Sequence, residues 1–143
     1  MEDELATSNV NRSYSLAATS TAIFTFILFF LYPRFSSGEI NALLFQGTLI
    51  VMGVATFSFV FASFCYYSSS LGDRIDDAER ASYSRRGDRL WLVGSTLLFL
   101  DPSLILCLIG LLAVASVWFA LWLGYLLFVI RQFPRVQTTR KSF

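Results

Sequence analysis

The chain has 143 residues, of which 55% are hydrophobic and only 15% carry a charge, and its formal net charge is +1. Water-soluble domains usually carry about 25% charged residues. This deficit, together with long apolar runs, excludes an ordinary soluble domain and predicts a single all-α integral membrane domain. The near-zero net charge provides no global field that would attract nucleic acid, so no nucleic-acid partner is expected.

The first apolar segment, residues 14–32, is followed by Pro33-Arg34, which we expect to close it. As a helix it would rise about 28 Å, close to the roughly 30 Å of a hydrocarbon core. Residues 1–13 before it are acidic rather than basic, and no clear A-x-A cleavage site follows it. These features predict a retained transmembrane helix after a short N-terminal segment, rather than a signal peptide.

A second apolar segment covers residues 40–67 and is long enough to tilt or to project beyond the bilayer. The connection after it, residues 68–89, is the only long polar one. Acids dominate its first half and arginines its second half, which suits the dipole of a short helix. We expect a solvated helical loop here, and the alternative is a docking surface for a partner.

Residues 90–130 contain a single formal charge, Asp101, in the stretch LFLDPSLIL. As one helix this block would span about 60 Å, so it must form two helices. A turn at Asp101-Pro102 would leave a first helix of only about 16 Å, far short of the hydrocarbon core. A turn at Ile109-Gly110-Leu111 instead gives two helices of equal length. The favoured helices are 90–108 and 112–130.

The Asp101-Pro102 pair nevertheless resembles the N-cap and first residue of a helix. The favoured arrangement therefore places a break or kink inside the third helix, because proline removes a backbone donor. The side chain of Asp101 would then cap the restarted half. The alternative, with Asp101 at or near an outer turn, stays open at this stage.

Basic residues are distributed very unequally among the connections. In a four-helix arrangement, ten of them fall on the side of both termini and the 68–89 loop, and only Arg34 falls on the other side. The positive-inside rule then predicts that both termini are cytoplasmic. The short turn at residues 109–111 predicts that helices three and four form a tight hairpin. The transmembrane domain would cover residues 14–132, followed by a basic cytoplasmic tail at 133–143. We expect it in the cell membrane.

Asp101 is the candidate intramembrane polar site. Counting depth along each predicted helix places Thr25, Thr56 and Ser116 at its level, but no lysine, arginine or histidine. An ionised carboxylate without a cationic partner is costly inside a membrane. Asp101 is therefore expected either to hold its proton or to bind a cation, and the structural alternative is a cap that stabilises the proline break.

Small residues predict where helices approach closely. Ser116, Ala120 and Gly124 form a small-xxx-small ridge on the fourth helix, and Gly53 offers a second small site on helix two. The ridge would pack either inside the protein's own bundle or against another subunit. Trp118 and Trp122 flank it and would face lipid or a neighbouring subunit.

The chain has no histidine, which removes the commonest general base and metal ligand. No nucleotide-binding or metal motif occurs, so no enzyme activity, cofactor or metal is expected. The sequence favours a non-catalytic multi-pass membrane protein: a subunit, scaffold or assembly factor of a membrane complex. The alternative is an oligomeric proton or cation pathway that uses Asp101. The expected partners are the lipid bilayer and a homo-oligomer or larger membrane complex.

Overall fold

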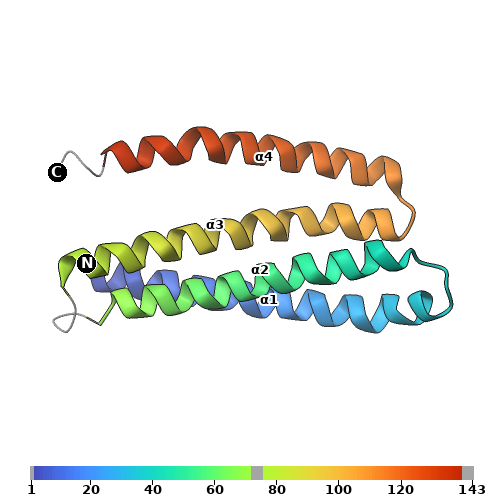
Figure 1. Ribbon diagram of the computed structural model, residues 1–143, viewed down its shortest axis with the longest axis horizontal. Coiled ribbons are helices and arrows are strands. Elements are labelled where there is room, and N and C mark those ends of the chain that lie inside the picture. The colour runs from blue at the N-terminus through green and yellow to red at the C-terminus, as the bar shows by residue number, and fades with distance from the viewer. Residues whose placement is uncertain (1, 72–75, 140–143) are drawn as a thin grey trace.

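The computed structural model is all-helical (Figure 1). The structure describes residues 2–71 and 76–139, with side chains over 7–71 and 76–131. Each of the four helices contains a segment long and apolar enough to cross a membrane. The predicted all-α class and the four spans are thus confirmed. The helices are α1 Glu2–Ser36, α2 Ala42–Ser69, α3 Asp77–Leu108 and α4 Leu112–Thr139.

Two helices begin earlier than the apolar segments that predicted them. α1 already starts at Glu2, within the expected N-terminal segment, and α3 starts at Asp77, within the expected loop. Asp77 and Glu79 lie in the first turn of α3, where negative charge favours the helix dipole. The 32 residues of α3 rise about 48 Å, so one end extends beyond a hydrocarbon core of about 30 Å. Arg74 and the basic residues of the tail lie outside the side chains that the structure describes.

The helices continue past their prolines, including Pro33, where the first one was predicted to end. α1 continues past Pro33 to Ser36, and α4 continues past residue 134 to Thr139. α3 likewise runs unbroken through Pro102. A proline removes only one backbone donor, and the remaining bonds of the turn persist: the Ser37 amide donates to the carbonyl oxygen of Pro33 at 3.1 Å. Such prolines are tolerated in membrane helices, where neighbouring groups satisfy the freed carbonyl.

Two glycines terminate helices at the same end of the molecule (Figure 1). Gly38 and Gly110 have φ values of 79° and 82°, a left-handed conformation that favours glycine. After Gly38, the Glu39 amide donates to the carbonyl of Arg34, five residues earlier, at 3.0 Å. After Gly110, the Leu111 amide likewise donates to the carbonyl of Leu106 at 2.9 Å. This is the Schellman pattern. Residues 109–111 therefore connect α3 to α4, and Asp101 lies within α3 rather than at a turn.

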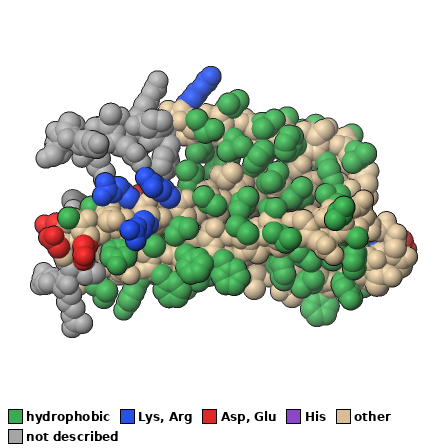
Figure 2. Space-filling model, viewed as in Figure 1, with side chains coloured by type: hydrophobic (Ala, Val, Ile, Leu, Met, Phe, Trp, Pro, Cys, Tyr) green, Lys and Arg blue, Asp and Glu red, His purple; other side chains and the backbone are tan. Residues whose placement is uncertain are grey.

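We call this end the glycine-turn end, and the opposite end of the helices the arginine end. Most charged side chains visible in Figure 2 gather at the arginine end, and apolar side chains cover much of the remaining surface. On this apolar surface large side chains are strongly exposed, for example Leu43 at 81% and Phe29 at 76%. Lipid is the environment that suits such a surface. The arginine end carries Arg12, Arg80, Arg85, Arg86 and Arg89.

α2 lies at the centre of the packing, because it contacts both α1 and α3, whereas α4 packs mainly against α3. The buried residues of α2 recur at alternating steps of three and four, the pattern of left-handed helix packing. A cluster of apolar residues fills the core near the glycine-turn end. Its buried members are Ile27, Leu31, Ile40, Phe45, Met52 and Leu108.

Candidate functional site

Asp101 is buried inside the helix bundle. Its side chain is only 1% exposed, and neither carboxyl oxygen has a hydrogen-bond partner among the described residues. The predicted cap of a restarted helix is therefore not formed, because α3 does not restart and the Asp101 carboxyl accepts no hydrogen bond from a described backbone N–H. Asp101 is thus an acid placed in the packed interior of the bundle, where an unpaired charge is costly.

The position of Asp101 follows from a repeat along α3. Gly87, Gly94, Asp101 and Leu108 are seven residues apart and all buried, so they share one face of the helix. Two of them, Gly87 and Gly94, contact aromatic rings of α2. Gly87 lies in the segment expected to be a polar loop and Gly94 in the third apolar span. The sequence prediction did not identify either glycine as a packing site.

The aromatic rings of α2 lie directly on the two glycines. A Cβ atom added at Gly94 would lie 3.0 Å from Cε1 of Phe59, and one added at Gly87 would lie 2.9 Å from Cε1 of Tyr66. α2 and α3 therefore approach closely in antiparallel register. Seven residues further along α3 is Asp101, and seven residues back along α2 is Met52, which is fully buried.

The hydroxyls predicted to accompany Asp101 bond elsewhere. Thr25, Thr56 and Ser116 each donate to a carbonyl of their own helix, at 2.9, 2.9 and 2.8 Å. Thr25 and Ser116 are also exposed. The structure thus does not bring these three hydroxyls to the carboxyl group, because matching depth along a helix does not ensure matching orientation.

Other hydroxyls line the core toward the arginine end. Ser13 and Ser20, seven residues apart on α1, are fully buried, and neither hydroxyl has a partner among the described residues. Ser63 of α2 is also fully buried and donates to the carbonyl of Phe59 at 2.9 Å. The core between the arginine end and Asp101 is consequently richer in hydroxyls than the core beyond Asp101.

The small-residue ridge on α4 faces away from α3. Ser116, Ala120 and Gly124 are all exposed, and a Cβ added at Gly124 would meet nothing within 4 Å. Gly53 on α2 is half-buried and would likewise meet nothing within 4 Å. None of the predicted packing glycines is therefore used for close approach between the described helices.

α4 is attached to α3 through side chains that donate to backbone carbonyls. The indole N–H of Trp122 donates to the carbonyl of Thr96 at 2.8 Å, and that of Trp118 donates to the carbonyl of Phe99 at 3.2 Å. From the side of α3, the Ser103 hydroxyl donates to the carbonyl of Ala115 on α4 at 3.1 Å. The tryptophans were expected to face lipid or a neighbouring subunit, but their indole N–H groups point toward α3.

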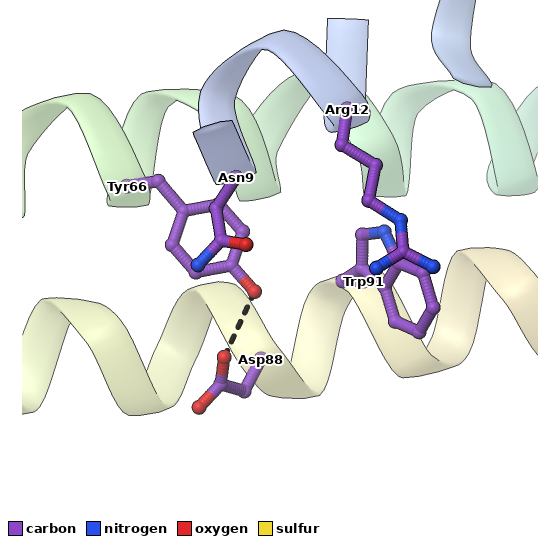
Figure 3. Close-up of a pocket in the computed structure, with 5 residues that line it drawn as sticks. All are labelled: Asn9, Arg12, Tyr66, Asp88 and Trp91. Atoms are coloured by element: carbon purple, nitrogen blue, oxygen red, sulfur yellow. Dashed lines mark hydrogen bonds between the residues drawn. The ribbon is translucent and has the colours of Figure 1, made fainter. Parts of the chain in front are cut away.

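A pocket of about 190 Å³ opens at the arginine end (Figure 3). The Tyr66 hydroxyl donates to Oδ1 of Asp88 at 2.9 Å. The Arg12 guanidinium carbon lies 5.0 Å from the centroid of the Trp91 ring, a cation–π contact. α1, α2 and α3 each contribute to the lining, so the pocket exists only in the folded bundle. Its residues are Asn9, Arg12, Tyr66, Asp88 and Trp91.

No family model, curated protein or solved structure matches this chain.

The chemistry of the protein therefore has to be inferred from its own side chains. Two places combine polar groups with burial or concavity: the interior around Asp101 and the pocket at the arginine end. Asp101 can hold a proton or attract a cation, because its two oxygens are unbonded within the described residues. The pocket presents a cation, an anion and two aromatic rings to one shared space.

Proposed function

We propose that this chain is a non-catalytic subunit, scaffold or assembly factor of a membrane complex, and that it contacts its partner through the outward face of α4. The observation that carries the proposal is the exposed ridge of Ser116, Ala120 and Gly124. The two tryptophans bind α3 from the opposite side of the same helix. α4 thus has one face attached to the chain and one face free to meet another helix.

The composition of the free face supports a helix as its neighbour. Helix association inside a membrane depends on van der Waals packing, and small residues spaced four apart allow two backbones to approach closely. Lipid chains make no such demand, and large apolar side chains cover other exposed surfaces of this protein, such as Phe26 and Phe29. A second membrane helix therefore explains the ridge better than lipid does.

We further propose that both termini are cytoplasmic, that α3 and α4 form a tight hairpin, and that the chain resides in the cell membrane. The described arginines of the N-terminal region and of α3 lie at the arginine end. At the glycine-turn end, Arg34 pairs with Glu39 at 3.1 Å. The positive-inside rule assigns the arginine-rich end to the cytoplasm.

A single substitution on the ridge tests the proposed contact. Gly124→Leu places a branched side chain where the partner backbone would approach. The protein isolated in mild detergent should therefore have a lower mass for this variant than for the wild-type complex. Gly47→Leu is the matched control, because a Cβ at Gly47 also meets nothing within 4 Å and lies on another helix. Light scattering coupled to gel filtration reports the mass. A wild-type protein that is monomeric and partner-free would contradict the proposal.

A second candidate function is an oligomeric proton or cation pathway through Asp101. It is favoured by the burial of both carboxyl oxygens without a partner and by the two unbonded serine hydroxyls between Asp101 and the arginine end. Asp101→Asn keeps the size of the side chain and removes its charge. In liposomes, wild-type protein should pass protons or cations and the variant should not. Absence of flux from the wild type would exclude this function.

A further inference from the structure

We propose that the pocket at the arginine end binds the headgroup of an ethanolamine phospholipid, with the lipid phosphate against Arg12 and the ammonium group against Asp88. This inference concerns a lipid site and is independent of the proposed contact through α4. It rests on the charges that line the pocket, on their order along the helices, and on the surface beside it.

Among the described residues the pocket is lined by one cation, Arg12, and one anion, Asp88. No ion pair within 4.0 Å joins these two described side chains, whereas Arg34 and Glu39 pair at 3.1 Å at the other end of the molecule. Arg12 instead lies over the ring of Trp91, and one oxygen of Asp88 accepts from Tyr66. Two opposite charges that face one space without bridging it suit a ligand that carries both charges itself.

The order of the two charges matches a phospholipid headgroup. Arg12 and Trp91 each lie three residues closer to the middle of their helix than the pocket residues Asn9 and Asp88. Because α1 and α3 both run from the arginine end, the cation lies deeper by about 4.5 Å. In a phospholipid the phosphate is likewise attached on the glycerol side, and the amine lies further out.

The chemistry of the lining favours a primary ammonium group. Ethanolamine offers three N–H donors to the Asp88 carboxylate, whereas the methylated ammonium of choline has none. Choline is usually held by aromatic faces, but Arg12 already lies over the Trp91 ring, and the Tyr66 ring packs against Gly87. An anionic headgroup without an amine would leave Asp88 facing negative charge. At about 190 Å³ the pocket has the volume of about six waters, the scale of a small headgroup.

The surface beside the pocket favours a lipid over a soluble molecule. The pocket lies where the first charged residues meet the apolar spans, since Tyr14 and Val93 follow within two residues of Arg12 and Trp91 and are exposed. Figure 2 shows charged and apolar side chains meeting near this end of the molecule. Acyl chains can run along the apolar side chains while the headgroup occupies the pocket.

Native mass spectrometry of the delipidated full-length protein tests the proposal with defined lipids. Phosphatidylethanolamine should bind at least tenfold more tightly than phosphatidylcholine or phosphatidylglycerol of the same acyl chains. Arg12→Gln and Asp88→Asn should each weaken its binding at least tenfold. The matched controls are Arg89→Gln and Asp77→Asn, which remove exposed charges that do not line the pocket. Both controls should bind as the wild type does.

Three results of the lipid-binding measurements would overturn the inference. One is equal binding of the three lipids, another is a preference for phosphatidylglycerol, and the third is wild-type binding by Asp88→Asn. Free phosphoethanolamine, added as a competitor, should not displace the lipid at comparable concentration; displacement would show that a soluble molecule is the ligand. If Arg12→Gln fails to fold, Arg12→Lys keeps the cation and should retain selectivity for ethanolamine.

Discussion

The two halves of the bundle core are built differently. Toward the glycine-turn end, large apolar side chains such as Ile27 and Phe45 form the contiguous cluster. Toward the arginine end, the buried positions are mostly glycine, alanine and serine, and Phe59 and Tyr66 lie on Gly94 and Gly87. Asp101 lies at the level of Met52, the member of the apolar cluster that borders the small-residue half.

The comparison shows two ways of holding helices together in lipid. The apolar half fills space with side-chain volume, as a soluble core does. The small-residue half lets backbones approach, so that each aromatic ring contacts the neighbouring helix itself. The second way tolerates no added carbon at the contact, but it leaves hydroxyls such as those of Ser13 and Ser20 buried without partners among the described residues.

The largest expected effect comes from adding one carbon in the small-residue half. Gly94→Ala brings a Cβ to 3.0 Å from the Phe59 ring, which is fully buried, so the ring has to shift to admit it. Overpacking of this kind costs about 1–3 kcal/mol. Unfolding by a denaturing detergent in mixed micelles measures the change. Gly53→Ala is the control and should be neutral or stabilising by about 0.5–1 kcal/mol, because nothing lies within 4 Å. Equal behaviour of the two variants would remove the distinction between the halves.

An effect of comparable size and opposite sign is expected at Asp101. Asp101→Leu replaces a buried carboxyl group with an apolar side chain of similar shape, and an unsatisfied buried polar group costs about 1–3 kcal/mol. The variant should therefore unfold at a higher detergent fraction than the wild type. Asp101→Asn, which keeps a buried polar group, should gain less. Destabilisation by leucine would mean that the carboxyl group is bonded in the membrane.

The smallest effect is expected at the unpartnered hydroxyls. Ser20→Ala removes a buried hydroxyl that has no partner among the described residues, but the missing oxygen also leaves a small cavity, so stability should rise by less than about 1 kcal/mol. The matched variant in the apolar half is Thr48→Val, which removes a buried hydroxyl that does have a partner. The Thr48 hydroxyl donates to the Leu44 carbonyl at 2.8 Å. A loss above about 1 kcal/mol for Ser20→Ala would show that the hydroxyl does bond, and would make the small-residue half a polar network.

Much of the fold could be predicted from hydropathy and length. The number of spans, the position of the connection at residues 109–111 and the placement of Asp101 inside α3 all follow from the length needed to cross a bilayer. α1 continues past the end predicted at Pro33, and the connection at 68–89, expected to be a helical loop, is helical from Asp77 and continuous with the third span. Proline removes only one donor, and the polar residues of the loop continue the helical turns of α3.

The candidate site was predicted less well than the fold. Depth counting placed Thr25 and Ser116 at the level of Asp101, but both are exposed and bond to their own helices. Gly87 and Gly94 could have been found from their seven-residue spacing to Asp101. The hydrogen bond from Tyr66 to Asp88 joins two helices across 22 positions of the sequence, and no local sequence pattern predicts it.

The sequence by itself determined that this protein has four apolar helices, where one connection falls, and that a single acid lies within an apolar span. Those properties depend on how far a helix rises per residue and on the thickness of a bilayer. Only the tertiary structure decided which face of each helix is buried. That choice depends on contacts between helices: it turns Asp101 inward, turns the α4 ridge outward, and brings Arg12, Asp88 and Trp91 to one pocket.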